Sequence, residues 1–247
     1  MGVWSPVFKI KQWKVEGTNF TATMQAETVT KQFIESKMLK VIPRDSWFTF
    51  WGGQLTGQIL SDYPEAASVQ IERNIKQGIK IKIIGRETVA VWCQCGATIA
   101  SATTTEKEKI VLPVSERCFF IDSGGLAFRE SPEISGTLLP TFFRPVSVEP
   151  ELGRVIMASS TIQFAVQARQ QLRDAEVNFL GFILPVEEGS ADLTALTDQG
   201  WAVYFDANRS LDAQAKVLSA LLGGELKERR GSLKYVDLRT PTRVYYK

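Results

Sequence analysis

The residue types best suited to acid–base and nucleophilic catalysis are sparse in this sequence. None of the 247 residues is a histidine. Mechanisms that need an imidazole are therefore excluded, among them the Ser-His-Asp and Cys-His pairs, zinc sites built on histidine and the usual proton shuttle near neutral pH. Carboxylate pairs, Ser-Lys pairs and cysteine chemistry remain possible.

The three cysteines lie at two places in the chain, Cys93-Gln94-Cys95 and Cys118. Three thiolates without a fourth ligand make an incomplete zinc shell, and the spacing matches no standard zinc motif. We interpret all three as free thiols. A disulfide between Cys93 and Cys118 is the alternative if their two strands are neighbours, so the redox compartment stays open.

The acidic residues considered for a catalytic pair are Glu187-Glu188, with Asp122, Asp206 and Asp237 elsewhere. Adjacent residues in a loop point apart, and Gly189-Ser190 next to the glutamate pair indicates an exposed tip. Solvated charges are favoured over a glycosidase-like dyad. We therefore expect no catalytic residue, no cofactor and no bound metal.

An aromatic cluster, Trp47, Phe48, Phe50 and Trp51, lies between two predicted helices. Core packing of a small domain is the favoured interpretation. A sugar-binding platform or a wedge into a membrane is the alternative.

Overall charge and hydropathy narrow the class of protein. The formal net charge of +2 and the lack of a dense Lys/Arg stretch argue against nucleic acid as a partner. No apolar run is long enough to cross a bilayer. Val3–Phe8 would also suit the end of a membrane anchor, because tryptophan favours the interface. Composition leaves both interpretations open.

The elements of the first third form a β-α-α-β-β unit. Alternation predicts a strand over Val7–Glu16, and helical spacing predicts helices at about 24–38 and Gln54–Leu60. A hairpin follows, with Ala67–Ile75 paired to Ile79–Ile83. In its second strand the isoleucines face one way and the lysines the other, which indicates one buried and one wet face.

Beyond Thr88 most segments are predicted strands. Helices are expected at about 160–174 and 212–222, and residues 96–108 are expected to form a loop because they lack periodicity. The predicted strands are Val89–Cys93, Cys118–Asp122, Leu126–Phe128, 176–184, 201–206, Leu233–Leu238 and Arg243–Tyr246.

Taken in order, several short motifs resemble the extracytoplasmic part of the FtsQ/DivIB family of bacterial cell-division proteins, with its POTRA domain and following β domain. Each motif is weak alone, but six occur in the right order over nearly the whole chain. They are Val7–Gly17, Tyr63-Pro64 with the hairpin strands, Gly85–Ala90, Phe120–Phe128, Leu139-Pro140 and Tyr235–Arg239. Thr88 departs from the proline usual at the domain junction.

The resemblance implies an α+β protein of two domains, a POTRA-like domain at 1–86 and a larger mixed β domain at 87–247. It implies a non-enzymatic scaffold of the division machinery, a single-pass membrane protein whose bulk lies outside the cytoplasmic membrane. A membrane helix would precede this sequence. The implied partners are division proteins of the FtsB/DivIC and FtsL types.

In that family the last strands of the β domain receive the partner by strand addition. An exposed terminal strand suits this independently, because its backbone edge is unpaired. The predicted partner-binding residues are Arg239, Thr240, Pro241, Thr242, Arg243, Val244, Tyr245 and Tyr246. Two alternatives remain: a POTRA-bearing envelope-assembly or secretion component, and a cell-wall hydrolase or transferase using Glu187 or a cysteine.

Overall fold

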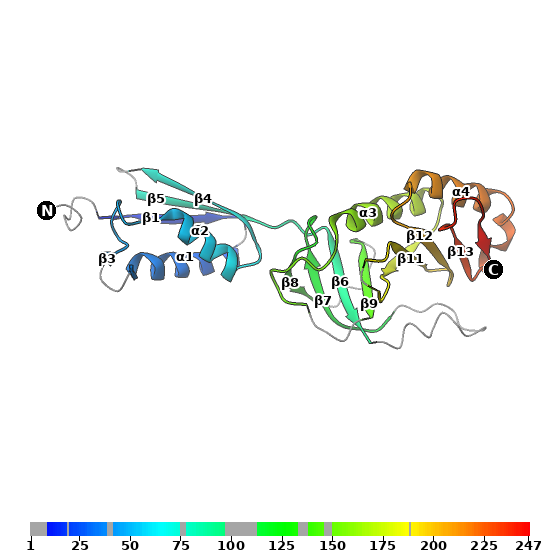
Figure 1. Cartoon of the computed structure of the whole chain (residues 1–247), viewed down its shortest axis with the longest axis horizontal. Helices are drawn as coiled ribbons and strands as arrows, with labels where there is room; N and C mark the ends of the chain where they lie inside the picture. Colours follow the sequence, from blue (N-terminus) through cyan, green and yellow to red (C-terminus); the bar gives the residue numbers. More distant parts are fainter. Residues whose placement is uncertain are drawn as a thin grey trace. The chain divides into compact units, whose positions relative to one another are not determined.

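The computed structural model shows an α+β chain that divides into two compact units, residues 1–87 and 88–247 (Figure 1). The α+β class expected from the sequence is confirmed. Placement is described for residues 9–18, 20–38, 42–74, 78–96, 113–132, 138–145, 150–187 and 189–247. Most of the predicted loop at 96–108 lies outside these ranges. Within them, no helix combines the length and the hydropathy that crossing a bilayer requires.

The first unit is built on a three-stranded sheet. Its order is β1 (Trp13–Gly17), β5 (Gly78–Gly85) and β4 (Ala66–Asn74), with β1 parallel and β4 antiparallel to the central β5. The isoleucines of β5 at 79, 81 and 83 are buried, and its lysines lie on the other face in ion pairs. The predicted alternation is therefore confirmed, because burial of one face fixes the register of the strand.

Two helices cover the buried face of this sheet, α1 (Phe20–Glu35) and α2 (Gly52–Asp62) (Figure 1). The helix predicted at 24–38 begins earlier and ends earlier than expected. It ends because β2 (Lys37–Met38) pairs with β3 (Ile42–Pro43) in a short antiparallel ladder. Apolar side chains of both helices and of the sheet form one core, which contains residues of this unit alone.

The second unit contains a nine-stranded mixed sheet in the order β14-β13-β12-β11-β10-β9-β6-β7-β8. Three of its neighbouring pairs, β6–β9, β9–β10 and β12–β13, are parallel and the other pairs are antiparallel. The strands are β6 (Ala90–Cys95), β7 (Ser115–Ile121), β8 (Ala127–Ser131), β9 (Thr141–Pro145), β10 (Phe179–Ile183), β11 (Asp192–Thr197), β12 (Ala202–Asp206), β13 (Tyr235–Asp237) and β14 (Tyr245–Tyr246).

The two α-helices described in this unit each lie in a connection between two parallel strands. The helix α3 (Ser159–Asp174) leads from β9 to β10, and α4 (Leu211–Gly223) leads from β12 to β13 through the 3-10 helix η3 (Lys227–Ser232). The two helices contact each other and bury Ile162, Leu172, Leu218 and Leu222 in the main core of the unit. Both helices agree with the sequence prediction. The strands β9 and β11 are additions that it missed.

Candidate functional site

The last strand, β14, lies at the end of the nine-stranded sheet, and among the described residues it pairs only with β13. Tyr246 lies opposite Val236 and Tyr245 opposite Asp237. The backbone N–H of Lys247 donates to the carbonyl of Tyr235 at 3.2 Å. Because backbone groups of successive residues in a strand point to opposite sides, the N–H and C=O of Tyr246 point away from β13, toward the open edge.

The side chains of this strand divide between the core and the surface. Val244 and Tyr246 pack against the main core, and the Tyr246 hydroxyl donates to Oε1 of Glu225. That hydrogen bond raises the pKa of Tyr246 above the usual tyrosine range. Tyr245 is 49% exposed. One face of β14 therefore anchors the strand, while the other presents an aromatic ring beside an open backbone edge.

The opposite end of the sheet, at β8, is partly covered. The N–H of Ala127, the first residue of β8, donates to the Arg154 carbonyl at 2.9 Å, and the Ala127 carbonyl accepts from Gly153 at 2.7 Å. Gly125 has φ +80°, and a Cβ there would lie 1.9 Å from the Met157 carbonyl oxygen. The start of β8 is thus covered by a following segment of the chain. This protects an edge that would otherwise pair with other chains.

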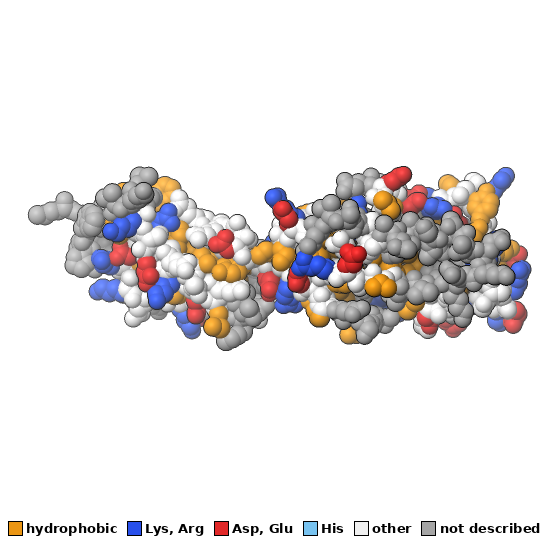
Figure 2. Space-filling model, turned by 90° about the horizontal axis from the view of Figure 1, so that it is seen from below, with side chains coloured by type: hydrophobic (Ala, Val, Ile, Leu, Met, Phe, Trp, Pro, Cys, Tyr) orange, Lys and Arg blue, Asp and Glu red, His pale blue; other side chains and the backbone are white. Residues whose placement is uncertain are grey.

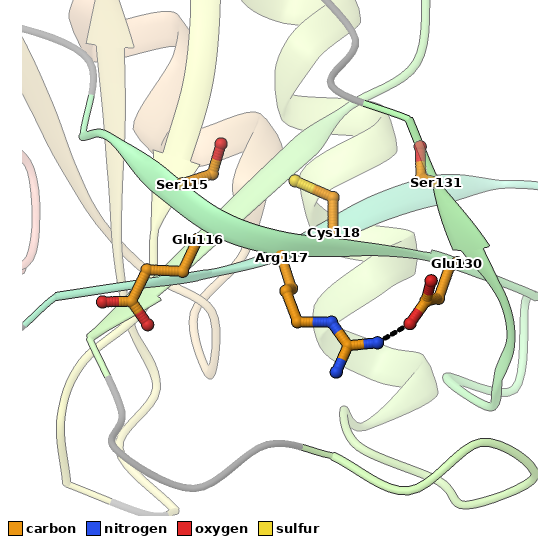
Figure 3. A pocket seen from close by; sticks show the side chains of 6 residues that line it. All are labelled: Ser115, Glu116, Arg117, Cys118, Glu130 and Ser131. Carbon is orange, nitrogen blue, oxygen red and sulfur yellow. Dashed lines mark ion pairs between the residues drawn. The ribbon is translucent and has the colours of Figure 1, made fainter.

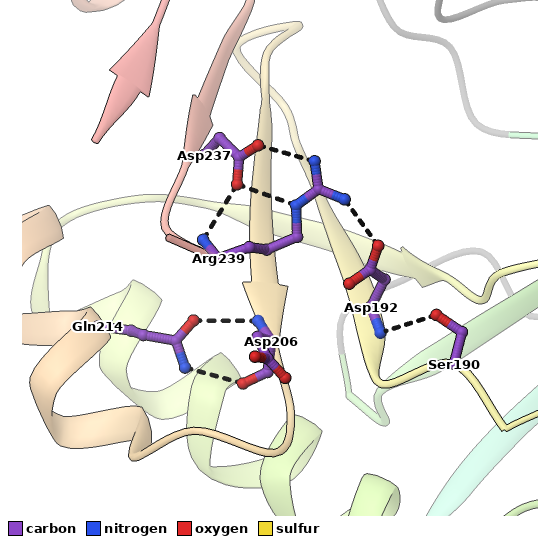
Figure 4. Close-up of polar contacts among 6 residues, drawn as sticks. All are labelled: Ser190, Asp192, Asp206, Gln214, Asp237 and Arg239. Carbon is purple, nitrogen blue, oxygen red and sulfur yellow. Dashed lines mark hydrogen bonds and ion pairs between the residues drawn. The ribbon is translucent and has the colours of Figure 1, made fainter. Parts of the chain in front are cut away.

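Arg239 follows β13 and makes an ion-pair network within its own chain (Figure 4). Its guanidinium donates through Nε and Nη2 to the two carboxylate oxygens of Asp237, at 2.9 and 2.7 Å, and through Nη1 to Asp192 at 2.7 Å. It also lies over the ring of Tyr204, 5.1 Å from the ring centroid. Three of the five guanidinium N–H groups of Arg239 therefore already have acceptors within the chain.

The ion-pair network around Arg239 changes the pKa values of its members. Partial burial pushes the pKa of Asp237 upward, but hydrogen bonds from the side chain and backbone of Arg239 outweigh burial, and the pKa lies below the usual aspartate range. The hydrogen bond to Asp237 raises the pKa of Arg239 further above its ordinary value. Burial raises the pKa of the Tyr204 hydroxyl. Asp237 and Arg239 are therefore ionised together at neutral pH.

The remaining predicted residues connect the network to the edge strand. Thr240 is half-buried, and Pro241, Thr242 and Arg243 are exposed in the turn between β13 and β14. The structure thus brings all eight predicted partner-binding residues, 239–246, into one terminal hairpin.

Sequence reasoning missed three polar residues that hold this hairpin and the strand beside it. Asp192 accepts from Arg239, and Glu225 accepts from Tyr246. The Gln214 side chain caps the end of β12 by accepting from the Asp206 N–H at 3.0 Å and donating to the Asp206 carbonyl at 2.9 Å (Figure 4). No local pattern identifies Asp192 or Glu225, because each meets its partner only through the pairing of distant segments.

The prediction that all three cysteines are free thiols is only partly correct. Cys93 lies opposite Cys118 in the β6–β7 ladder, and the two form a disulfide, so the free-thiol interpretation is wrong for this pair. It is correct for Cys95, which is buried and free. Burial raises the pKa of the Cys95 thiol to about 11. Within the described ranges, no group of three or more cysteine or acidic side chains is placed to hold a metal.

Beside this disulfide is a small hollow of about 190 Å³ lined by residues of β7 and β8 (Figure 3). Arg117 and Glu130 face each other from these strands and form an ion pair, while the Cys118 side chain points away from them. Surface ion pairs of this kind have little net effect on stability. This hollow therefore does not indicate a reactive site around the Cys118 sulfur.

A larger hollow, of about 540 Å³, lies beyond the carboxyl ends of β9 and β10 and beside the start of α3. Glu187 lines it together with Arg144 and Asn208. Glu187 is the one carboxylate among the described lining residues, and Glu188 is outside the described ranges. Two of the other carboxylates considered from the sequence do not line this hollow but accept hydrogen bonds within local turns.

Those two are Asp122 and Asp206. Asp122 accepts from the N–H groups of Gly124 and Leu126, and Asp206 accepts from the N–H of Asn208. Asp237 is paired with Arg239. Asp122, Asp206 and Asp237 are thus engaged in contacts of their own, and none of the three is among the residues that line the hollow with Glu187.

The aromatic cluster of the first unit is divided between core and surface. Phe50 is buried and Trp47 is half-buried against the core, as core packing predicts. Phe48 and Trp51 are 63% and 56% exposed, so core packing is wrong for these two.

No protein-family model matches the chain, and no curated protein is significantly similar to it.

Proposed function

We propose that this chain is a non-enzymatic scaffold of bacterial cell division that binds and recruits other division proteins at the outer face of the cytoplasmic membrane. The motifs that resemble the FtsQ/DivIB family support this assignment. The proposed partners are proteins of the FtsB/DivIC and FtsL types, and the proposed attachment is a membrane helix N-terminal to this sequence.

The observation that carries the proposal is the edge formed by β14. The backbone of Tyr246 faces outward, and Tyr245 adds exposed aromatic area next to it. An extended segment of a partner gains affinity from backbone hydrogen bonds to such an edge and gains specificity from its alternate side chains. The covered start of β8 makes β14 the more accessible end of this sheet.

The disulfide supports the proposed location. Disulfides persist in oxidising compartments and are rare in the bacterial cytosol. A bond between Cys93 and Cys118 therefore favours the extracytoplasmic side of the membrane.

Amide hydrogen exchange, with and without the ectodomain of an FtsB/DivIC-type partner, tests the proposal. The N–H of Tyr246 should exchange rapidly in the free chain and become protected in the complex, because it gains an acceptor on the added strand. Binding without protection at Tyr246 would place the partner elsewhere and remove the edge mechanism. Absence of binding to any division protein of these types would remove the scaffold assignment.

A further inference from the structure

Residues Arg44–Trp51 of the first unit, which we term the aromatic loop, form a tightly held turn. The Ser46 carbonyl accepts from the N–H groups of Thr49 and Phe50, at 3.0 and 2.8 Å. The Thr49 hydroxyl donates to the Pro43 carbonyl at 2.6 Å. The loop is thus fixed by its own backbone before any ligand is present.

Phe50 fastens this loop to the domain. Its ring is buried edge-on against Phe33, with 5.9 Å between the ring centroids, and its carbonyl accepts from Arg73 at 2.8 Å. With Phe50 turned inward, Phe48 and Trp51 on either side of it are held on the surface at 63% and 56% exposure. Two large exposed aromatic side chains on a rigid turn are typical of a binding surface.

Cationic side chains surround the aromatic loop. Lys9 pairs with Asp45 of the loop at 3.1 Å, Lys37 lies opposite Pro43 in the β2–β3 ladder, and the Arg73 guanidinium lies over Phe50. The exposed Lys11 beside Lys9 adds another cation, and Arg44 of the loop lies over the buried ring of Phe33. Figure 2 shows several lysine and arginine side chains, with acidic side chains between them, at one end of this unit.

The aromatic loop and these cations lie in four segments of the chain, 9–12, 36–38, 42–51 and 71–74, in which acidic residues are fewer than basic ones. These segments contain five lysines and arginines against two carboxylates, Asp45 and Glu72. Glu72 has its own partner in Lys82. The charge complements a negative surface, and the aromatic residues are those that favour the boundary between headgroups and acyl chains.

From this arrangement we infer that the aromatic loop docks on the surface of an anionic phospholipid bilayer, with Trp51 and Phe48 inserted at headgroup depth. The inference rests on the proposed membrane attachment. Lys9 bridges to Ser46, so the chain enters this unit directly beside the loop and would hold it near the membrane. The contact is separate from strand addition at β14 and fixes how the first unit sits on the lipid.

Vesicle flotation of the 247-residue chain tests this contact. Vesicles of equal parts phosphatidylglycerol and phosphatidylcholine should bind the chain, and vesicles of phosphatidylcholine alone should bind it much less. The double variant Phe48→Ala/Trp51→Ala should lower the partition coefficient roughly tenfold or more, because both apolar side chains are lost. Lys11→Glu/Lys37→Glu should also weaken binding, by about fivefold or more per residue at low salt, because each cation is replaced by an anion.

The matched control is Met24→Ala, which shortens an exposed apolar side chain of α1 in the same unit, outside the aromatic loop. It should leave flotation unchanged. All variants should keep the wild-type melting temperature, since the altered side chains lie on the surface.

Flotation of Phe48→Ala/Trp51→Ala equal to wild type, or no flotation of wild type on anionic vesicles, would overturn the lipid contact. So would loss of partner binding or of self-association in the double variant with flotation intact, because the loop would then be a protein interface. Partner protection at Tyr246 is measured without lipid. Failure of the lipid contact and failure of the scaffold assignment are therefore told apart.

Discussion

Arg239 and Asp192, 47 residues apart in the chain, are joined by an ion pair of 2.7 Å that reaches across β12. The guanidinium lies over Tyr204, a residue of β12, on its way from the end of β13 to the start of β11. This one side chain thus ties three strands together directly before the turn into β14. We expect it to help fix the position of the proposed binding edge.

Replacing Arg239 should loosen the terminal hairpin. In Arg239→Ala, Asp192 and Asp237 lose their common donor. Because the arginine side chain is 39% exposed, solvent screening limits the expected loss of unfolding free energy to about 1 kcal/mol. Affinity for an FtsB/DivIC-type ectodomain should fall as well, through the displaced edge. Urea unfolding and a binding titration measure the two effects.

Arg239→Lys is the control for this prediction. It keeps the charge but loses the forked contact with Asp237, so it should restore only part of the stability and affinity. If affinity fell in Arg239→Ala while exchange rates in β14 stayed as in wild type, Arg239 would contact the partner directly.

Proline in the edge segment should separate binding from folding. Val244→Pro removes a backbone donor and constrains the segment that leads into β14. The affinity for the partner should fall about tenfold or more, whereas the melting temperature should fall by only a few degrees, because part of the contact of Val244 with the core is lost but the rest of the core is untouched. Truncation after Arg239 should abolish binding. Calorimetric titration and thermal melts check both variants.

Val186→Pro is the matched substitution, at an exposed valine outside any strand. It should bind as wild type does. Undiminished affinity in both Val244→Pro and the truncated chain would exclude strand addition at this edge.

Acid should weaken the Arg239 network. The pKa of Asp237 is lower in the folded chain than the ordinary aspartate value of 3.8. Its contribution to stability is therefore fully present above the unfolded pKa and is lost as the pH falls through the folded pKa. Urea midpoints of wild type and Asp237→Asn should differ at pH 6 and converge on acidification below about pH 4. A constant difference down to about pH 2 would contradict the proposed pairing.

The number of free thiols should differ between unreduced and reduced protein. Unfolded, unreduced protein should show one thiol, Cys95, and reduced protein three. Cys93→Ser/Cys118→Ser should lower the unfolding free energy by roughly 2–4 kcal/mol, since the bond closes a loop of 25 residues. Native Cys95 should react slowly at about pH 8, because burial raises its pKa to about 11. Three thiols before reduction would show that the bond does not form.

The first unit should fold when expressed alone as residues 1–86. Its buried apolar cluster contains only residues of this unit, from Val15 to Ile83. The fragment should therefore give dispersed amide resonances and a cooperative melt. A narrow, unfolded spectrum would mean that its core needs the rest of the chain.

Local periodicity predicted the elements that bury one face. The alternation of Ile79, Ile81 and Ile83 identified β5, and helical spacing identified α3 and α4 to within about one residue. The strands β9 and β11 were missed. Thr141–Pro145 is a short run ending in proline, and Asp192–Thr197 is buried on both faces toward its end and so does not alternate.

The sequence by itself determined most of the helices and strands, because these follow from spacing between near neighbours, and the order of its motifs suggested the α+β class. Tertiary structure alone decided that Cys93 meets Cys118, that Asp192 meets Arg239, and that Phe48 and Trp51 lie outside the core. Such contacts depend on which strands become neighbours and on which aromatic ring of the cluster occupies the core. Chain-wide packing sets both, and no local pattern encodes them.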